Sequence, residues 1–283
     1  MKISKAVYGA LVILMLFQGC AASSPKKARQ IPAQLTPAEM KEIELGSQIH
    51  AQVLSSFYLY TEPRLLAYVN SLGTRVAELA ERQNLSYQFT VILDEKIFAT
   101  SAPGGYVYVT TGMINFLDNE AQLAAVLAHE IAQIQYRDPR FTKSRERIEK
   151  ITTGGTVVGG FFGNFGALAV LGLQAMNALT DEKSTEARVD AADKLTLHYL
   201  PAVGYDPECW ADVLYKMLRL QGDDLVRLFD YYNARPISEN RLRRIRKTLG
   251  NLDIQGKTLG TRGPEYLQAT KGVREIYKTS TAV

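Results

Sequence analysis

The chain has 283 residues, of which 46% are hydrophobic and 22% are charged. This is the composition of an ordinary globular protein that can bury a core, and it excludes the disordered and collagen-like classes. Lysine and arginine together number 33 against 29 acidic residues. Because grooves that follow phosphate backbones need a larger and more clustered positive excess, we expect no nucleic acid among the partners.

Residues 1–20 are typical of a lipoprotein signal peptide. Lys2 and Lys5 precede an apolar run over residues 6–17, which is shorter than the roughly 20 residues of a membrane-spanning helix. Phe17-Gln18-Gly19-Cys20 resembles a bacterial lipobox, so we expect Cys20 to be acylated and to become the mature N-terminus. A plain secretory signal that happens to end in cysteine is the alternative.

Residues 21–35 are polar and carry no apolar period, which predicts a flexible tether. Ala21 and Ala22 follow the lipid site without an aspartate. By resemblance to bacterial lipoprotein sorting, this implies the outer membrane, with the protein facing the periplasm. If Cys20 carries lipid, Cys209 has no partner in the chain, and we expect it to be a buried apolar residue beside Trp210.

The predicted elements begin at residue 36. Thr36-Pro37-Ala38-Glu39 has the pattern of a capping box with proline at the first helical position, so a helix starts at about Pro37. Helical periodicity continues to about Arg82, with a break near residues 60–63. The content of valine, isoleucine, phenylalanine and tyrosine predicts strands over residues 88–93 and 106–110. We expect one domain over residues 36–250 and a short C-terminal tail over residues 251–283.

The most informative stretch is a helix that Asn119 caps. Leu123, Leu127, Ile131 and Ile134 form its predicted core stripe, and His129 and Gln133 share the opposite face. His129-Glu130-Ile131-Ala132-Gln133 is one residue away from H-E-x-x-H, in which two histidines bind zinc and the glutamate activates a water molecule. Taken alone, an ordinary His-Glu pair on a helix is the simpler interpretation.

Several spaced motifs accompany this helix. They are Tyr68-Val69-Asn70-Ser71-Leu72-Gly73, the run from Pro103 to Gly112, Asn119-Glu120, Ala192-Asp193 and Gly204-Tyr205-Asp206-Pro207. In this order they resemble the gluzincin metallopeptidases of family 48, which include CAAX prenyl endopeptidases, mitochondrial Oma proteases and periplasmic chaperone-peptidases. The resemblance covers residues 38–250. It implies a mainly α fold with a small β-sheet, whose edge strand over the cleft binds extended peptide; we expect Tyr106, Val107, Tyr108, Val109 and Thr110 to form that strand.

The sequence departs from the family at the metal ligands. By the resemblance, His129 is the only retained ligand, because the second histidine falls on Gln133 and the third ligand on Ala191. Catalytic zinc needs three protein ligands, and an amide or a methyl group cannot replace an imidazole or a carboxylate. We therefore expect no cofactor. Zinc is expected only if the chain is an active peptidase after all.

Three other family positions are informative in the same way. Glu130 matches the general base, which would be vestigial here, and Asp193 matches the aspartate that orients a ligand. By the resemblance, Arg235 replaces a histidine close to the family's active site, whereas Arg241 matches the arginine that follows it in the family. Asp190 and His198 are poor substitute ligands, because the first is rotated by about 100° from Ala191 on a helix and the second lies roughly 10 Å along it.

Two segments remain open. Residues 151–180 carry no charge and contain G-x-x-x-G steps, which predicts a helical pair over the cleft or a surface that binds a membrane or a partner. The basic group after residue 240 is expected to be a solvated helix face, with contact to acidic lipid headgroups as the alternative. Its members are Arg241, Arg243, Arg244, Arg246 and Lys247.

These observations lead to one expected function and two alternatives. We expect a lipid-anchored, periplasm-facing binding or assembly factor that acts on unfolded or envelope polypeptides in protein quality control and is not a catalyst. An active zinc metalloendopeptidase that degrades misfolded envelope proteins is the first alternative. A purely structural lipoprotein is the second.

Overall fold

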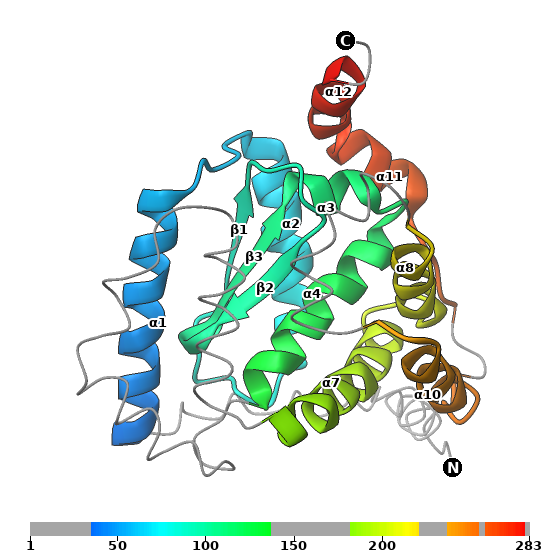
Figure 1. Cartoon of the computed structure of the whole chain (residues 1–283), viewed down its shortest axis with the longest axis horizontal. Helices are drawn as coiled ribbons and strands as arrows, with labels where there is room; N and C mark the ends of the chain where they lie inside the picture. Colours follow the sequence, from blue (N-terminus) through cyan, green and yellow to red (C-terminus); the bar gives the residue numbers. More distant parts are fainter. Residues whose placement is uncertain (1–34, 137–181, 221–236, 255–257, 281–283) are drawn as a thin grey trace, which may run out of the picture. The chain divides into compact units, whose positions relative to one another are not determined.

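The computed structural model describes residues 35–136, 182–220, 237–254 and 258–280. Cys20, Arg235 and the uncharged segment 151–180 lie outside these residues. The predicted fold class is confirmed, because the chain is mainly helical with one small sheet (Figure 1). No helix of the described ranges is both long and apolar enough to cross a membrane.

The two predicted N-terminal helices are present. Helix α1 (Pro37–Ser56) begins at the expected capping box, in which the Thr36 hydroxyl accepts from the Glu39 backbone N–H and the Glu39 carboxylate accepts from the Thr36 N–H. Helix α2 (Pro63–Ala77) starts after the predicted break, with the Glu62 side chain as its cap. It buries an apolar stripe at helical spacing that consists of Leu65, Val69, Leu72 and Val76.

The sheet corrects the predicted edge strand. It contains β1 (Gln88–Ile92), β2 (Ala99–Ala102) and β3 (Tyr106–Thr110), in the order β1-β3-β2. Strand β3 is therefore central, with β1 parallel on one side and β2 antiparallel on the other. The prediction was wrong because β2, with the sequence Ala-Thr-Ser-Ala, has no strand-forming pattern of branched or aromatic side chains.

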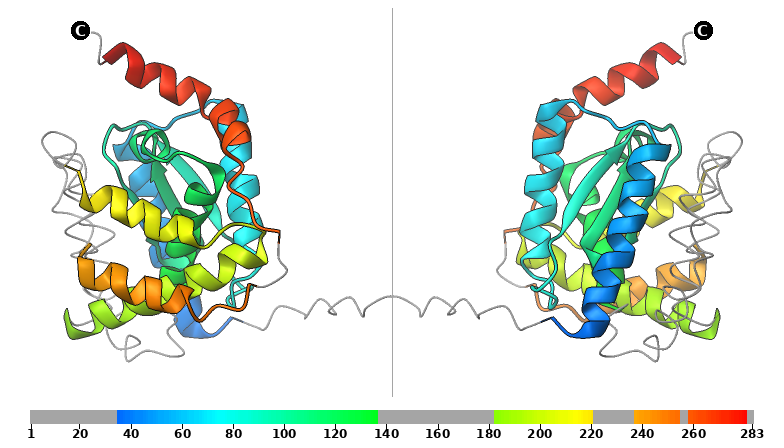
Figure 2. Two further views of the ribbon diagram at one scale, coloured as in Figure 1. Left: turned by 90° about the vertical axis from the view of Figure 1, so that its right-hand side faces the viewer. Right: turned by 90° about the vertical axis from the view of Figure 1, so that its left-hand side faces the viewer.

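The two faces of the sheet pack against different helices. Tyr106 and Tyr108 of β3 point to α1, where His50 stacks on the Tyr106 ring and its Nδ1 lies 3.0 Å from the Tyr108 hydroxyl. Val107 and its partner Ser101 point to the other face, on which α2 and α4 lie (Figures 1 and 2). The alternation of side chains along the strands therefore determines which side chains meet the helices on each face.

Helix α1 packs closely against the turn between β2 and β3. This turn, η1 (Pro103–Gly105), uses positive φ angles of 81° at Gly104 and 104° at Gly105, which glycine adopts without strain. A Cβ atom at Gly46 of α1 would lie 1.9 Å from the Pro103 carbonyl oxygen, so only glycine permits the contact. Beside it, the Glu42 carboxylate forms a buried ion pair with Arg82, with the nearest atoms 2.7 Å apart.

Helix α4 (Glu120–Gln135) is the central element of the described fold. It follows the short helix α3 (Thr111–Phe116), and the Asn119 side chain caps it as predicted. All of its residues are buried, so the predicted division into a core stripe and an opposite face underestimated its burial. It packs against α2, β2, α7 (Glu182–Ala202) and α8 (Glu208–Leu218), as Figure 1 shows. Because α4 is buried on all sides, both its apolar and its polar side chains contact other parts of the protein.

The expected C-terminal tail belongs to the fold. After α10 (Glu239–Leu249), which packs on α7 and α8, the chain forms α11 (Gly263–Ala269) and α12 (Lys271–Ser280) (Figure 2). Tyr266 is fully buried and donates to the Ile114 carbonyl at 2.5 Å, and Val273 is also buried. Helix α11 packs against α2 and α4, and α12 packs against α3, which the tail prediction overlooked.

Candidate functional site

A cluster of buried polar side chains joins α4 to α7, α8 and α10. We call it the Asp193 cluster. Its members are His129, Gln133, Asp193, Trp210 and Arg241. Each is at most 3% exposed, so every charge and polar atom in it requires a partner within the protein.

Asp193 is the acceptor at the centre of the cluster. Arg241 forms a two-pronged ion pair with it, with its Nε and Nη2 atoms each 2.9 Å from a carboxylate oxygen, and Trp210 Nε1 donates at 3.0 Å. Arg241 was expected on a solvated helix face, and that prediction is wrong, because its guanidinium turns inward to neutralise Asp193. Truncating either partner would leave an unpaired buried charge.

The His129 ring is fixed on three sides. It stacks on Trp210 with ring centroids 4.7 Å apart, and its Nδ1 lies 3.3 Å from the Asp193 carboxylate. That carboxylate favours the tautomer with the proton on Nδ1, which leaves the lone pair on Nε2. The Gln133 amide nitrogen lies 3.2 Å from Nε2 and donates to that lone pair. Gln133 thus forms a hydrogen bond with Nε2, the atom through which His129 would bind a metal.

Glu130 faces a different neighbour. One step along α4 from His129, its side chain points to the sheet, where the Ser101 hydroxyl of β2 donates to the carboxylate at 3.0 Å. Both residues are fully buried. The structure therefore brings Glu130 next to β2, and not next to the strand that the sequence predicted.

Helix geometry corrects the position assigned to the third ligand. Asp193 points at His129, and the residue one turn earlier on the same face of α7 is Val189, which is 5% exposed. Ala191 lies two residues before Asp193 and is rotated by about 200° from it. Its backbone carbonyl accepts from the Tyr136 hydroxyl at 3.3 Å. The side chain that faces the cluster at this level is therefore the valine.

The residues present do not fit a catalytic zinc ion. His129 offers one imidazole whose lone pair is hydrogen-bonded to Gln133, and neither Val189 nor Ala191 has a donor atom in its side chain. Asp190 pairs with Arg244 at 2.9 Å on another side of α7, and His198 is exposed. Across the described ranges, no group of three or more His, Cys, Asp or Glu side chains could hold a metal.

A second polar cluster lies at the opposite end of α4. We call it the Glu120 cluster. The Glu120 carboxylate accepts from the hydroxyls of Tyr68 and Tyr205, and it pairs with Arg75 at 3.3 Å and Arg262 at 3.2 Å. Burial would raise the pKa of Glu120, but the hydrogen bonds from the two tyrosines and the charge of Arg75 outweigh it, so the pKa lies below its ordinary value.

Sequence reasoning missed these partners, although part of the signal was present. Tyr68 and Tyr205 both belong to motifs that carry the family resemblance, but nothing in the sequence shows that they meet at Glu120. Trp210 was considered only as a neighbour of Cys209. The buried state predicted for Cys209 is confirmed, and burial, reinforced by nearby carboxylates, raises the pKa of its thiol to about 12.

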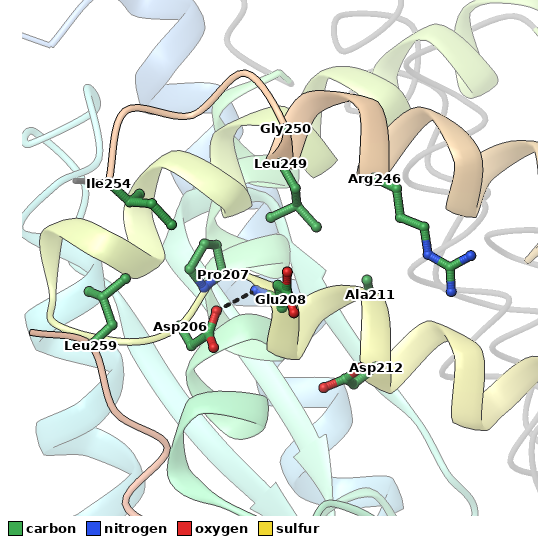
Figure 3. Close-up of a pocket in the computed structure, with 10 residues that line it drawn as sticks. All are labelled: Asp206, Pro207, Glu208, Ala211, Asp212, Arg246, Leu249, Gly250, Ile254 and Leu259. Carbon is green, nitrogen blue, oxygen red and sulfur yellow. Dashed lines mark hydrogen bonds between the residues drawn. The ribbon is translucent and has the colours of Figure 1, made fainter. Parts of the chain in front are cut away.

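One cavity lies away from both clusters. It measures about 660 Å³ and lies between α8, the end of α10 and the segment that follows it (Figure 3). Its walls carry the carboxylates of Asp206, Glu208 and Asp212, and Arg246 is the only cation among the described residues that line it. Burial and the nearby Asp206 raise the pKa of Asp212. None of the predicted site residues lines this cavity.

Comparisons with known proteins identify peptidases as relatives of this chain. The chain is 28% identical over 183 residues to the beta-barrel assembly-enhancing protease of Escherichia coli strain K12, which covers 63% of this chain and 38% of that protein. The Yersinia pestis protein of the same name is 27% identical over 183 residues, covering 62% of this chain and 37% of that protein. The mitochondrial metalloendopeptidase OMA1 of Schizosaccharomyces pombe is 24% identical over 219 residues, covering 76% and 60%.

The chain thus spans less than two thirds of the length of each of these relatives. The model of peptidase family M48 matches residues 63–249, which include α2, the sheet, α4, α7, α8 and α10. That range contains both polar clusters except Arg262. The chain belongs to peptidase family M48.

Proposed function

We propose that this protein is a non-catalytic member of family M48 that binds polypeptides in the bacterial envelope as an assembly or quality-control factor. The relatives named beta-barrel assembly-enhancing proteases support an envelope role. One observation carries the non-catalytic part. The Nε2 lone pair of His129 is hydrogen-bonded to Gln133, in a cluster where Val189 and Ala191 supply no further ligand.

Metal content and proteolysis test this proposal together. The purified mature chain should contain far less than one equivalent of zinc and should not cleave casein. Zinc at one equivalent together with casein cleavage that a chelator abolishes would replace the proposal with the active metalloendopeptidase, which the names of the relatives favour.

For the binding role, we propose that an extended polypeptide aligns with β2. It is an outer strand of the sheet, and Ser101 places it directly beside Glu130.

The purified chain tests the binding role directly. It should crosslink to an unfolded outer-membrane protein and not to the same protein once folded. If it crosslinks to neither, polypeptide does not bind, and the purely structural alternative gains support.

We also propose that Cys20 is the membrane anchor, with the protein on the periplasmic side of the outer membrane. The lipobox-like sequence before it and the polar tether after it support this location. A Cys20→Ala variant exported by a cleavable signal should fractionate as a soluble periplasmic protein. If it stays in the membrane pellet after a salt wash, another part of the chain, such as the segment 151–180, is the anchor.

A further inference from the structure

A second cavity, on the α7 side of α10, has a different character from the one in Figure 3. It measures about 290 Å³ and lies between α7 and α10. Most of the residues that line it have polar side chains, although apolar atoms supply much of its surface. The lining residues are Asp190, Asp193, Lys194, Leu197, Arg244, Ile245, Lys247, Thr248 and Asn251. The function proposed above uses only Asp193 of this set.

The charges in this cavity are unevenly compensated. Both of its carboxylates already have a cationic partner from α10, because Asp193 pairs with Arg241 and Asp190 pairs with Arg244 at 2.9 Å. The exposed Glu186, outside the lining, also pairs with Arg244, at 3.2 Å, so that these acidic and basic groups balance one another except for one carboxylate. Lys194 of α7 and Lys247 of α10 have no ion-pair partner in the described part of the chain. Two ammonium groups therefore line one cavity without a counter-charge.

Backbone electrostatics reduce this positive potential but do not cancel it. The cavity reaches the last turn of α10, where the helix dipole is equivalent to roughly half a negative charge. Two ammonium groups exceed that value. The Asn251 amide adds an uncharged donor at the rim. The balance favours a small anion that accepts several hydrogen bonds at once.

We propose that the cavity between α7 and α10 binds a phosphate group. Its oxygens would accept from Lys194, Lys247 and Asn251, while Asp190 keeps the Arg244 guanidinium in place at the cavity wall. The cavity in Figure 3, whose described lining has three carboxylates and one arginine, would repel the same group. This inference goes beyond the proposed function and does not depend on the state of the zinc site.

The phosphate could belong to a lipid headgroup or to a soluble phosphorylated compound, and the experiment distinguishes them. The full mature chain with Cys20→Ala is titrated with inorganic phosphate at constant ionic strength, followed by calorimetry. In parallel it is mixed with vesicles of phosphatidylcholine alone or with added phosphatidic acid. Binding to phosphate in solution indicates a soluble ligand, and binding only to the acidic vesicles indicates a headgroup; either result supports the site.

Two variants assign the binding to the cavity. Lys194→Gln with Lys247→Gln should weaken binding by about tenfold, since each exposed charge pair contributes up to roughly fivefold. The control, Arg64→Gln with Arg219→Gln, removes the same charge from exposed positions on α2 and at the end of α8, and it should bind like the parent. If neither probe binds the parent, or if the control loses as much affinity as the lysine variant, the proposal is wrong.

Discussion

The two ends of α4 carry two polar clusters, and in each a buried carboxylate accepts from arginine and aromatic side chains. At the N-terminal end, the Glu120 carboxylate accepts from two tyrosines and two arginines that come from four separate parts of the chain. At the other cluster, Asp193 accepts from Arg241 and Trp210, and the neighbouring His129 contacts the Gln133 amide where the family has a metal. The central carboxylate of each cluster thus has a cationic partner within the protein.

Under the proposed non-catalytic function, the family's metal-site scaffold is kept for its packing alone. The Asp193 cluster still joins four helices, and it needs no ion for that, because Arg241 supplies the positive charge that balances Asp193. If that interpretation is correct, disrupting either cluster should lower the free energy of unfolding. Only the Asp193 cluster should acquire metal when ligands are added.

The largest effect is expected from Asp193→Ala. It leaves the 1% exposed Arg241 guanidinium without its partner, so the free energy of unfolding should fall by about 3–5 kcal/mol, measured by urea denaturation. Asp190→Ala is the matched control on the same helix. Its partner Arg244 is partly exposed, and the loss should stay below about 1 kcal/mol. Equal losses for the two variants would show that Asp193 is not the centre of the cluster.

The next effect is a gain of zinc binding. Gln133→His together with Val189→Glu should place two new ligands on the faces that point at His129, and should give zinc near one equivalent by elemental analysis. At a hundredfold excess over the dissociation constant, zinc should then stabilise the fold by about 3 kcal/mol. Each single change should gain little.

The control for that design exchanges one position. Gln133→His with Ala191→Glu adds the same two side chains but puts the carboxylate on the wrong side of α7, so it should not bind zinc tightly. Tight zinc binding by this variant, and not by the Val189→Glu design, would restore Ala191 as the ligand position.

A smaller effect is expected at the Glu120 cluster. Glu120→Gln should lower the free energy of unfolding by about 2 kcal/mol near neutral pH, because the amide accepts more weakly from the tyrosines and arginines. Asp118→Asn, which breaks an exposed pair with Lys216, is the control and should cost less than about 1 kcal/mol.

The pH dependence sharpens that test. The folded-state pKa of Glu120 lies below its ordinary value of 4.5, so its contribution is present above that value and is lost as the pH falls through the folded-state pKa. Glu120→Gln should therefore have a shallower loss of stability in acid than the parent. Parallel acid profiles for the two proteins would mean that Glu120 is not held in its charged form.

The smallest effect is expected from Ser101→Ala. It removes one buried hydrogen bond to Glu130 and should cost about 1 kcal/mol, with no gain of casein cleavage. Measurable proteolysis in this variant would show that the Ser101 contact had restrained a working general base.

Local patterns predicted the elements that have strong local signals. The capping box at Thr36, the Asn119 cap and the β-branched residues of β3 each determine structure through neighbours in sequence. Strand β2 escaped prediction because Ala-Thr-Ser-Ala has no such preference, and its place is set by pairing with β3. The order of the strands, and with it the identity of the edge, depended on that one segment.

The site was predictable in its members but not in their directions. His129, Glu130, Gln133 and Asp193 were all singled out, and the structure brings His129, Gln133 and Asp193 together. The direction of a side chain on α7 depends on which residue faces α4, and that is why Ala191 was chosen in place of Val189. Arg241 was misjudged for a similar reason, because a run of cations on α10 does not show which of them faces inward.

The close packing of α1 on the rest of the fold, as at the contact between Gly46 and Pro103, limits how far the chain can be truncated. Helix α1 and helices α11 and α12 lie outside the range of the family match, yet Glu42 neutralises Arg82 and Tyr266 fills the core beside α3. A fragment limited to residues 63–249 would lose both, leaving a buried arginine uncompensated and a tyrosine-sized void. The smallest piece able to fold independently is therefore wider than the family segment, and fusion partners or affinity tags belong before residue 36 or after residue 280.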